Sequence, residues 1–175
     1  MDDKRVAATG TKEKKPRNIT TSQHWRPEAA LLDDQTSILS LLLQQDDGEG
    51  KEEEGKEKEN ELLKQALHAK HQGYKQQDLS KGLYVPDQLI SFTKMLALLA
   101  SSQLVCFYCQ RRTKIVYTSR CDPQQWTLER IDNKFGHNEG NVVIACLSCN
   151  VRRRTMYHER YRFTKQLVVV KKGTL

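Results

Sequence analysis

The sequence predicts an α+β protein in which a small, metal-held hairpin module follows a helical leader and a long polar N-terminal region. Three observations support this prediction. Two Cys-x2-Cys pairs, Cys106 with Cys109 and Cys146 with Cys149, are separated by 36 residues. Segments of strand-like composition lie between the pairs, and apolar residues recur at helical spacing upstream of them. The expected units are a disordered tail with a short helix and an acidic linker (1–59), a helical leader (60–103) and the metal-held module (104–175).

Composition indicates a soluble protein with a modest core. The chain has 175 residues, of which 37% are hydrophobic and 29% charged, as expected for a limited core with some disorder. No apolar stretch approaches the roughly 20 residues that a membrane-spanning helix needs, so we expect no membrane association. The N-terminus, Met-Asp-Asp-Lys-Arg, lacks an apolar signal core, which predicts an intracellular protein.

Charge is distributed unevenly along the chain. The formal net charge is +7, but residues 104–175 carry 14 Lys and Arg against 5 Asp and Glu, a net +9. Residues 46–61 carry 9 acidic residues against 3 Lys, a net −6. A basic region around a metal motif favours a polyanionic partner, because phosphate contacts release counterions. The alternative is an ordinary solvated surface, and charge alone does not separate the two.

The first 59 residues show few signs of a fold. Residues 1–23 are polar without periodicity and predict a flexible tail. The basic run Lys12–Arg17 is compatible with a nuclear import signal, a nonspecific phosphate contact or a plain solvated tail, so cytoplasm and nucleus both stay open. Apolar residues in Pro27–Gln45 predict a short helix, and the acidic, glycine-containing stretch Asp46–Glu59 predicts a flexible linker.

Two helices are expected in the leader. An apolar stripe predicts a helix over Asn60–Gln72, and Gly73 stands where a C-terminal cap belongs. The stretch Tyr74–Gly82 then reads as a turn or a short helix. A second helix is predicted over Pro86–Ser101, since proline suits the first helical turn and apolar residues follow at helical spacing. Both helices are expected to pack against the module.

The four paired cysteines predict a structural zinc site. Each Cys-x2-Cys pair forms a knuckle whose two thiolates reach one ion, and two knuckles complete a closed tetrahedral site. Such a site has no open coordination position, so this zinc is not expected to be the catalyst. It would supply folding energy to a module too small for a large core. Cys121 is left over and is expected to be a small buried apolar residue.

The chain between and after the knuckles predicts a hairpin and a helix. Strand-like composition covers Trp126–Ile131 and Val142–Ala145, with the glycine-containing loop Asp132–Asn141 between them. A helix is predicted from Asn150 to about Gln166. The resulting order of knuckle, β-hairpin, knuckle and helix predicts a treble-clef-like ββα module.

These segments resemble a known family. Trp126–Asn133, Gly136-His137 and Gly140–Asn150 are similar to the HNH endonucleases (ββα-metal or His-Me finger), and most similar to the zinc-containing branch that includes phage recombination endonuclease VII. In that branch four cysteines bracket the hairpin and an Asn directly follows the last one, as Asn150 does here. The resemblance covers about Cys106 to Arg154. Endonuclease VII acts as a dimer, so the resemblance leaves a homodimer open.

The helical stretch before the module also has a family likeness. Tyr74–Ser101 resembles the leaders of such modules in large DNA viruses and mobile elements, which implies an origin of that kind.

The resemblance implies a metal-dependent endonuclease that hydrolyses DNA phosphodiester bonds. A divalent ion, usually Mg²⁺ and distinct from zinc, would sit between the first strand and the helix, where it stabilises charge on the scissile phosphate. Carried over by position, Glu129 and Asn150 are its ligands, and hard oxygen donors of this kind suit Mg²⁺. Asn141 matches the Asn whose side chain fastens the loop across the hairpin.

The chain departs from the family where the general base is expected. The family usually has Asp-His where this chain has Glu129-Arg130, and Arg does not accept a proton at neutral pH. Either His137 acts as the base, or Arg130 grips the phosphate while the metal activates water, or the module binds DNA or a protein partner without cleavage. Neighbouring strand residues point to opposite faces, so Glu129 and Arg130 face Asn150 together only if the strand bends. Asp132 is a further ligand candidate or a turn residue.

Basic residues after the second knuckle are the candidate DNA contacts. Their expected role is to touch the phosphate backbone, which positions DNA without reading bases; the alternative is a solvated helix face. A third hypothesis places the working part of the protein in its N-terminal helices. The candidate contacts are Arg152, Arg153, Arg154, Arg160 and Arg162.

Overall fold

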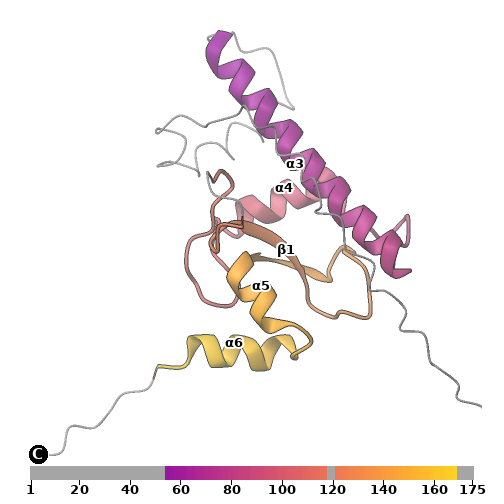
Figure 1. Cartoon of the computed structure of the whole chain (residues 1–175), viewed down its shortest axis with the longest axis vertical. Coiled ribbons are helices and arrows are strands. Elements are labelled where there is room, and N and C mark those ends of the chain that lie inside the picture. The colour runs from indigo at the N-terminus through magenta and orange to yellow at the C-terminus, as the bar shows by residue number, and fades with distance from the viewer. Residues whose placement is uncertain (1–53, 118–120, 169–175) are drawn as a thin grey trace, which may run out of the picture.

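The computed structural model describes residues 54–117 and 121–168 (Figure 1). The expected tail, the helix over Pro27–Gln45 and the first part of the acidic linker lie outside these residues. The described chain combines helices with a two-stranded antiparallel sheet, which confirms the predicted α+β class. Its elements are α3 (Glu54–Lys81), α4 (Phe92–Ser101), β1 (Trp126–Arg130), β2 (Val142–Cys146), α5 (Leu147–Arg153) and α6 (His158–Gln166).

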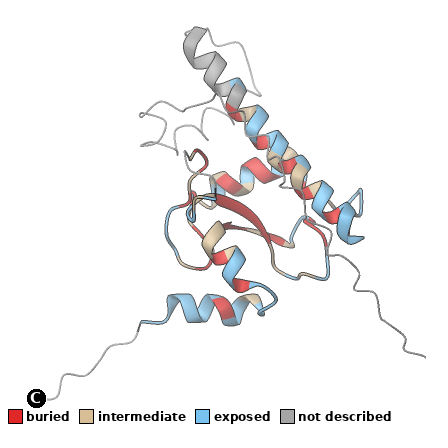
Figure 2. Ribbon diagram, in the orientation of Figure 1, coloured by how far each residue is buried: buried red, intermediate tan, exposed pale blue. Residues whose placement is uncertain are grey.

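The hairpin of β1 and β2 forms the centre of the fold. Trp126 pairs with Cys146, and Arg130 pairs with Val142 at the other end of the ladder. The outer edge of β1 is covered by α3, because the Tyr74 hydroxyl accepts a hydrogen bond from the Leu128 backbone N–H at 2.8 Å. An exposed strand edge carries unpaired backbone groups, and α3 provides partners for this one. All of β1 except Arg130 is buried (Figure 2).

The leader and the module share one hydrophobic core. Buried side chains from α3 and α4 join those of the hairpin in a single cluster, so the expected boundary after residue 103 does not mark a break in packing. A long helix that buries one apolar face in this way gains most of its stability from tertiary contacts. The cluster includes Leu63, Leu67, Tyr74, Ile90, Met95, Leu99, Trp126, Leu128, Val142 and Ile144.

Helix α3 is longer than expected at both ends. It begins at Glu54, inside the expected linker, and runs through Gly73 to Lys81, so the predicted end at Gln72 is wrong. The helix continues because Tyr74, one turn beyond Lys70, is buried against the hairpin. The C-terminal capping glycine is Gly82, which has a φ of +66°.

The end of α3 is a Schellman motif. The Gly82 N–H donates to the Leu79 carbonyl at 3.2 Å, and the Leu83 N–H donates to the Asp78 carbonyl at 2.9 Å. These two bonds satisfy carbonyls that the last helical turn leaves without partners, and glycine adopts the required left-handed conformation without strain. The motif directs the chain away from the helix beside Asp78.

Helix α4 begins at Phe92 rather than at Pro86. The Ser91 side chain caps it by accepting a hydrogen bond from the Lys94 N–H at 3.2 Å, which is the usual role of serine at this position. The segment before it binds the hairpin loop, since the Ile90 N–H donates to the His137 carbonyl at 3.0 Å. This tertiary contact takes the place of the expected first helical turns.

The chain after the second knuckle forms two helices instead of one. Helix α5 begins at Leu147 and ends at Arg153, and Arg154 has a φ of +53° that a continuing helix does not allow. Helix α6 follows and lies below α5 in Figure 1. Cys121, expected to be buried, is exposed with a φ of +61°. Over the described residues, no helix has both the length and the apolar character needed to cross a membrane.

Candidate functional site

The four predicted zinc ligands meet at one point. The sulfur atoms of Cys106, Cys109, Cys146 and Cys149 all lie within 4.8 Å of one another, and those of Cys109 and Cys146 are 3.9 Å apart. Tetrahedral zinc with bonds of about 2.3 Å requires sulfur separations of roughly 3.8 Å. The cluster can therefore bind a metal ion, and the residues fit the chemistry of zinc.

Local backbone structure places these sulfurs. The first knuckle closes through the Gln110 N–H, which donates to the Cys106 carbonyl at 3.0 Å, and Gln110 itself has a φ of +58°. The second knuckle is the start of α5, where the Cys146 sulfur accepts a hydrogen bond from the Cys149 N–H at 3.4 Å. The amide groups at the start of a helix favour negative charge, which suits a thiolate.

Crowding of the thiols changes their acidity. A hydrogen bond from the Cys146 thiol lowers the pKa of Cys106 to about 5, while burial raises the pKa of Cys149 to about 11. One thiolate is thus stabilised by its neighbours, and further anions beside it are disfavoured because like charges repel. A bound cation would remove that repulsion. Helix α6 closes this end of the molecule through Tyr161, whose ring lies 5.0 Å from that of Tyr108.

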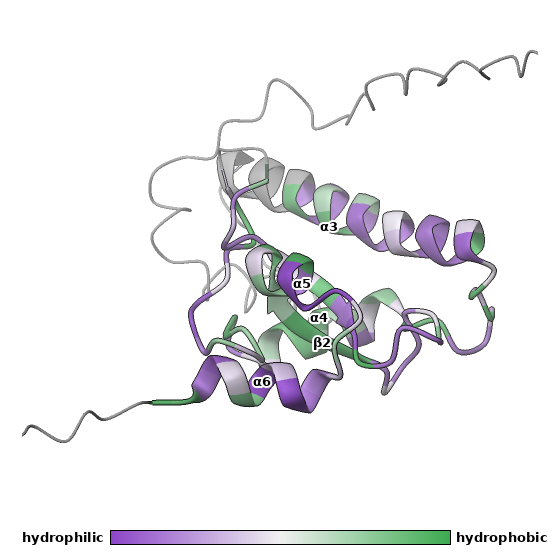
Figure 3. Ribbon diagram, turned by 60° about the horizontal axis from the view of Figure 1, so that its bottom comes forward, coloured by the Kyte–Doolittle hydropathy of each residue, from purple (hydrophilic) through white to green (hydrophobic). Residues whose placement is uncertain are grey.

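A cleft with a volume of about 620 Å³ lies on the other side of the hairpin. Its floor is β1, one wall is α3, and the other wall is α5 with part of the hairpin loop; Figure 3 shows α3 passing above α5. Five residues predicted from the sequence line this cleft together: Glu129, Arg130, His137, Asn150 and Arg154. We use "the cleft" below for the space that these residues and the α3 wall enclose.

His137 is held by a residue that sequence reasoning missed. The Asp78 carboxylate faces it with Oδ1 at 2.8 Å from Nδ1, and Oδ2 accepts a hydrogen bond from the His137 backbone N–H at 2.6 Å. Both side chains are buried. The second ring nitrogen, Nε2, has no hydrogen-bond partner among the described residues, although His137 lines the cleft. Burial lowers the pKa of His137, and the Asp78 carboxylate acts in the opposite direction.

Glu129 is buried against Arg153. The Arg153 Nε donates to Glu129 Oε1 at 2.5 Å, and both side chains are nearly inaccessible. Burial raises the pKa of Glu129, and the charge of Arg153 opposes that rise. The Arg153 guanidinium also donates to the carbonyls of Arg130 and Met156. Arg153, a predicted DNA contact, is therefore engaged inside the protein and is not accessible to a phosphate.

The two predicted asparagines differ in role. Asn150 lines the cleft, and its Nδ2 donates to the Thr127 hydroxyl at 3.1 Å. Asn141 ties the hairpin loop together, because its Oδ1 accepts from the Asp132 N–H at 2.9 Å and its Nδ2 donates to the Gly136 carbonyl at 2.9 Å. Asp132 is exposed and its Oδ1 accepts from the Lys134 N–H at 2.9 Å, as a turn residue does.

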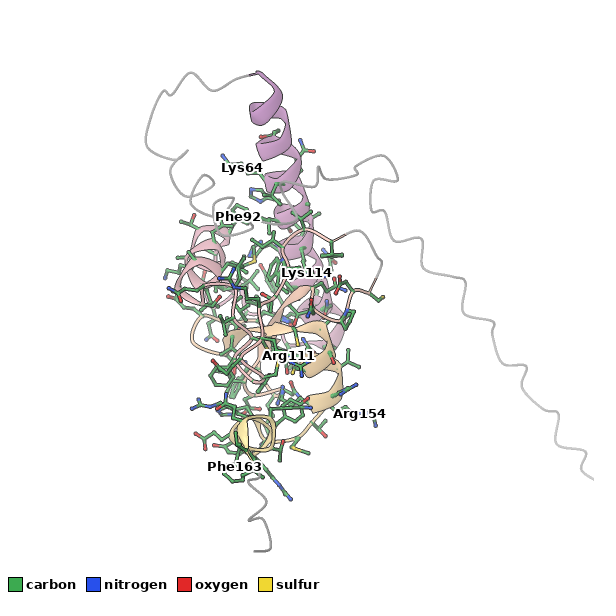
Figure 4. All side chains as sticks on the ribbon, turned by 90° about the vertical axis from the view of Figure 1, so that its left-hand side faces the viewer. Lys64, Phe92, Arg111, Lys114, Arg154 and Phe163 are labelled. Carbon is green, nitrogen blue, oxygen red and sulfur yellow. The ribbon has the colours of Figure 1, made fainter. Side chains whose placement is uncertain are left out.

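The remaining predicted arginines are exposed. Arg152 and Arg154 flank the buried Arg153, and the Arg154 side chain projects from the body of the molecule in Figure 4. Arg160 and Arg162 lie on α6, where the Arg162 guanidinium is 5.0 Å from the Phe107 ring centre. The exposed arginines thus lie on α5, just after it, and on α6.

Lys70 is a second residue of the cleft that sequence reasoning did not identify as functional. Its ammonium lies 4.1 Å from the Trp126 ring centre and donates to the Trp126 carbonyl. Burial lowers the pKa of Lys70 to about 7. The sequence does contain a signal for this role, because Lys70 falls at helical spacing within the apolar stripe of the leader. A cation on such a stripe must reach either solvent or a buried partner.

Comparisons with protein families, with curated proteins and with solved structures give no match to this chain.

Proposed function

We propose that this protein is a metal-dependent, HNH-like endonuclease that hydrolyses DNA phosphodiester bonds in the cleft. One observation carries the proposal: a single cleft contains Glu129, His137 and Asn150, which come from a strand, a loop and a helix that are separate in the sequence. An imidazole with one free nitrogen beside a carboxylate and an amide is the side-chain set that metal-assisted hydrolysis uses.

Zinc in the cysteine cluster would hold the module in a treble-clef-like arrangement. The knuckle at Cys106 precedes the hairpin, and the knuckle at Cys149 begins the helix that follows it. A four-sulfur site has no open position for water or substrate. Its contribution would therefore be to folding, since it fixes α5, and with it Asn150, against the hairpin.

Glu129 and Asn150 would hold a divalent ion such as Mg²⁺. Each has a side-chain oxygen, Oε2 and Oδ1 respectively, without a hydrogen-bond partner among the described residues. Mg²⁺ takes few protein ligands and completes its shell with phosphate oxygens and water. When bound, the ion would stabilise negative charge on the phosphate and on the leaving oxygen.

His137 would act as the general base. Its Nε2 accepts a proton from a water molecule as the water oxygen forms a bond to phosphorus and the bond to the leaving oxygen breaks. The leaving oxygen takes a proton from solvent. Asp78 keeps the proton of the neutral ring on Nδ1, so that Nε2 carries the free electron pair. Arg130 would contact the phosphate from the same cleft.

Binding without cleavage is the second candidate function, and the ion pair between Arg153 and Glu129 favours it. The guanidinium already neutralises the carboxylate, and the other charged side chains of the cleft are basic: Lys70, Lys81, Arg130 and Arg154. A cleft with this charge attracts a phosphate without the help of a cation. The same arrangement weakens electrostatic attraction for Mg²⁺ until a phosphate is bound.

A nicking assay separates the two candidates. Purified full-length protein is incubated with supercoiled plasmid and with circular single-stranded DNA, in the presence and absence of Mg²⁺ or Mn²⁺. The nuclease proposal predicts nicking that needs the added ion and falls on the order of 10²-fold or more in His137→Ala, the size of a lost general base. Lys94→Gln, which alters an exposed ion pair with Glu139 away from the cleft, serves as the matched control.

The controls decide what a negative result means. Zinc content must stay unchanged in His137→Ala and Lys94→Gln. If the unaltered protein retards DNA in a gel but leaves it uncut with either ion, the nuclease proposal is wrong and the binding function stands. Equal nicking by His137→Ala and the unaltered protein excludes His137 as the base.

A further inference from the structure

We propose that the cleft binds one unpaired nucleic-acid strand, with α3 contacting the phosphates on the side opposite α5. The inference rests on the proposed function only in assuming that the cleft accepts a phosphodiester, whether or not it is then cleaved. The helical leader would then form a second nucleic-acid-binding wall, in addition to the arginine-bearing helices after the second knuckle.

One stripe of α3 faces the cleft along three turns. Its members lie at positions i, i+3, i+4, i+7 and i+11, so they lie on one helix face. Two of the five are basic and one is glycine. The stripe consists of Lys70, Gly73, Tyr74, Gln77 and Lys81.

Positive charge stands on more than one wall of the cleft. Lys70 and Lys81 lie on α3, while Arg154 lies just after α5 and Arg130 ends the floor strand. The acidic side chain of the lining, Glu129, is paired with Arg153. A strand that enters the cleft therefore meets cations on both sides of its backbone, which is the arrangement that follows a phosphate chain.

Lys70 is placed where it could bind an anion in the cleft. Its ammonium is buried over the Trp126 ring, 4.1 Å from the ring centre, and burial lowers its pKa to about 7. A buried cation without a carboxylate partner is unfavourable, and among the described residues the Lys70 ammonium contacts a backbone carbonyl and two aromatic rings. A phosphate in the cleft would supply the missing negative charge.

Gly73 keeps the middle of the α3 wall open. Glycine inside a helix costs about 1 kcal/mol relative to alanine, so this position carries a cost to helix stability. A Cβ placed on Gly73 meets no heavy atom within 4 Å. Packing therefore does not explain the glycine, whereas a strand passing between α3 and α5 requires the space.

The two helical walls exclude an undistorted duplex. Glu129 and His137 are 5% and 3% exposed, so a phosphate that reaches them must sit low between the walls. A helix with its side chains is about 10–12 Å wide, while the minor groove of B-DNA is about 6 Å wide. A duplex strand lying between two helices would place one of them in its minor groove, where it does not fit. An unpaired strand has no partner strand to obstruct either wall.

Binding to labelled oligonucleotides tests the inference. A fluorescein-labelled 20-nucleotide DNA without self-complementarity, alone or annealed to its complement, is titrated with zinc-loaded full-length protein in buffer without added divalent ions. Fluorescence anisotropy should show at least tenfold tighter binding of the single strand. Gly73→Leu should weaken single-strand binding at least tenfold, and the matched variant Gln76→Leu, at an exposed α3 position outside the cleft lining, should leave it within twofold.

The salt dependence provides an independent arm. Each phosphate contact to a single strand contributes about −0.7 to the slope of log K against log salt. Lys81→Gln, which changes an exposed residue of the α3 wall, should make that slope shallower by about 0.7. This variant keeps the test valid if Gly73→Leu fails to fold.

The outcomes distinguish this inference from the proposed hydrolysis. Equal or tighter binding of the duplex, unchanged binding in Gly73→Leu that is folded, or an unchanged slope in Lys81→Gln each overturns it. Tight single-strand binding that depends on Gly73, together with no cleavage under Mg²⁺ or Mn²⁺, upholds it while the nuclease proposal fails. Cleavage of intact duplex that is unchanged in Gly73→Leu would support the nuclease proposal and overturn the single-strand inference.

Discussion

Asp78 binds His137 twice, through the ring at 2.8 Å and through the backbone N–H at 2.6 Å, although 59 residues separate the two in the chain. Tyr74, on the same helix as Asp78, has its ring 4.7 Å from the imidazole, so α3 fixes the position of the His137 ring. The leader is thereby a part of the candidate site, and a fragment beginning after α3 would lack the residue that orients His137.

Asp78→Asn should lower nicking and shift its pH dependence. In the proposed mechanism the neutral imidazole is the active form, so the rate should fall as pH decreases through the pKa of His137. Burial lowers that pKa, Arg130 and Lys81 lower it further, and Asp78 raises it. Removing the carboxylate charge should move the acid limb to lower pH and reduce the plateau on the order of 10²-fold. A rate–pH profile of both proteins measures this; a lower plateau with an unmoved acid limb would mean that Asp78 serves only structure.

The same pair predicts how stability depends on pH. His137 has a folded-state pKa below its ordinary value of 6.5, so below that value the unfolded chain binds the proton more strongly. The contribution of His137 to stability is therefore fully present above pH 6.5 and is lost as pH falls. Melting temperatures measured at steps between pH 5 and 7.5 should decline toward acid, and His137→Gln should decline less steeply. Parallel curves for the two proteins would contradict the assignment.

Gly136→Ala should destabilise the protein by about 1–3 kcal/mol. A Cβ on Gly136 would lie 2.6 Å from the Leu83 carbonyl oxygen and 2.7 Å from Asp78 Oδ2, and the backbone atom has little freedom to move. Gly73→Ala is the matched control, because its Cβ meets nothing and alanine favours the helix by about 1 kcal/mol. Urea denaturation should show free-energy changes of opposite sign for the two variants, and equal changes would show that the close contact at Gly136 relaxes.

Local patterns were predictable from the sequence, and long-range partners were not. The hairpin matches its predicted segments to within one residue, because β-branched composition and flanking glycines are local signals. The end of α3 was misplaced because Gly73 looks like a C-terminal cap, and only the burial of Tyr74 on the hairpin keeps the helix going. Asp78 carries no local mark of its partner, since its role depends on where a distant loop folds.

Helical spacing predicts which of the three consecutive arginines after the second knuckle is buried. Cys149 must face inward if it binds metal, and Arg153 lies four residues later on the same helix face. That spacing alone distinguishes Arg153, which is buried, from Arg152 and Arg154, which are exposed. A buried guanidinium is stabilised by an anionic partner, and the structure shows that this partner is Glu129.

Removing one partner of the Arg153–Glu129 pair should destabilise the protein more than replacing both partners with apolar residues. Arg153→Met alone leaves Glu129 buried without its cation, and such single removals cost about 3–5 kcal/mol. The double variant Arg153→Met with Glu129→Leu should recover a large part of that loss, since both buried charges are gone. Denaturation midpoints of the two single variants and the double variant form the cycle. Additive losses would show that the pair is not coupled.

Removing the metal should unfold the module. The sulfur cluster brings four thiols within 4.8 Å, and a bound cation would stabilise all four as thiolates. We expect one zinc per chain, and we expect Cys106→Ser to lose both the zinc and the cooperative melting transition. Zinc content by elemental analysis and thermal melting followed by circular dichroism are the measurements.

Cys121→Ser is the matched control for that experiment, because Cys121 is exposed and lies outside the cluster. It should keep both the zinc and the transition. The same pair of variants separates folding from chemistry: a closed four-sulfur site contributes no open position to catalysis, so nicking by Cys106→Ser should fall only in proportion to the folded fraction. Loss of nicking in a Cys106→Ser protein that still melts cooperatively would contradict a purely structural role for this metal.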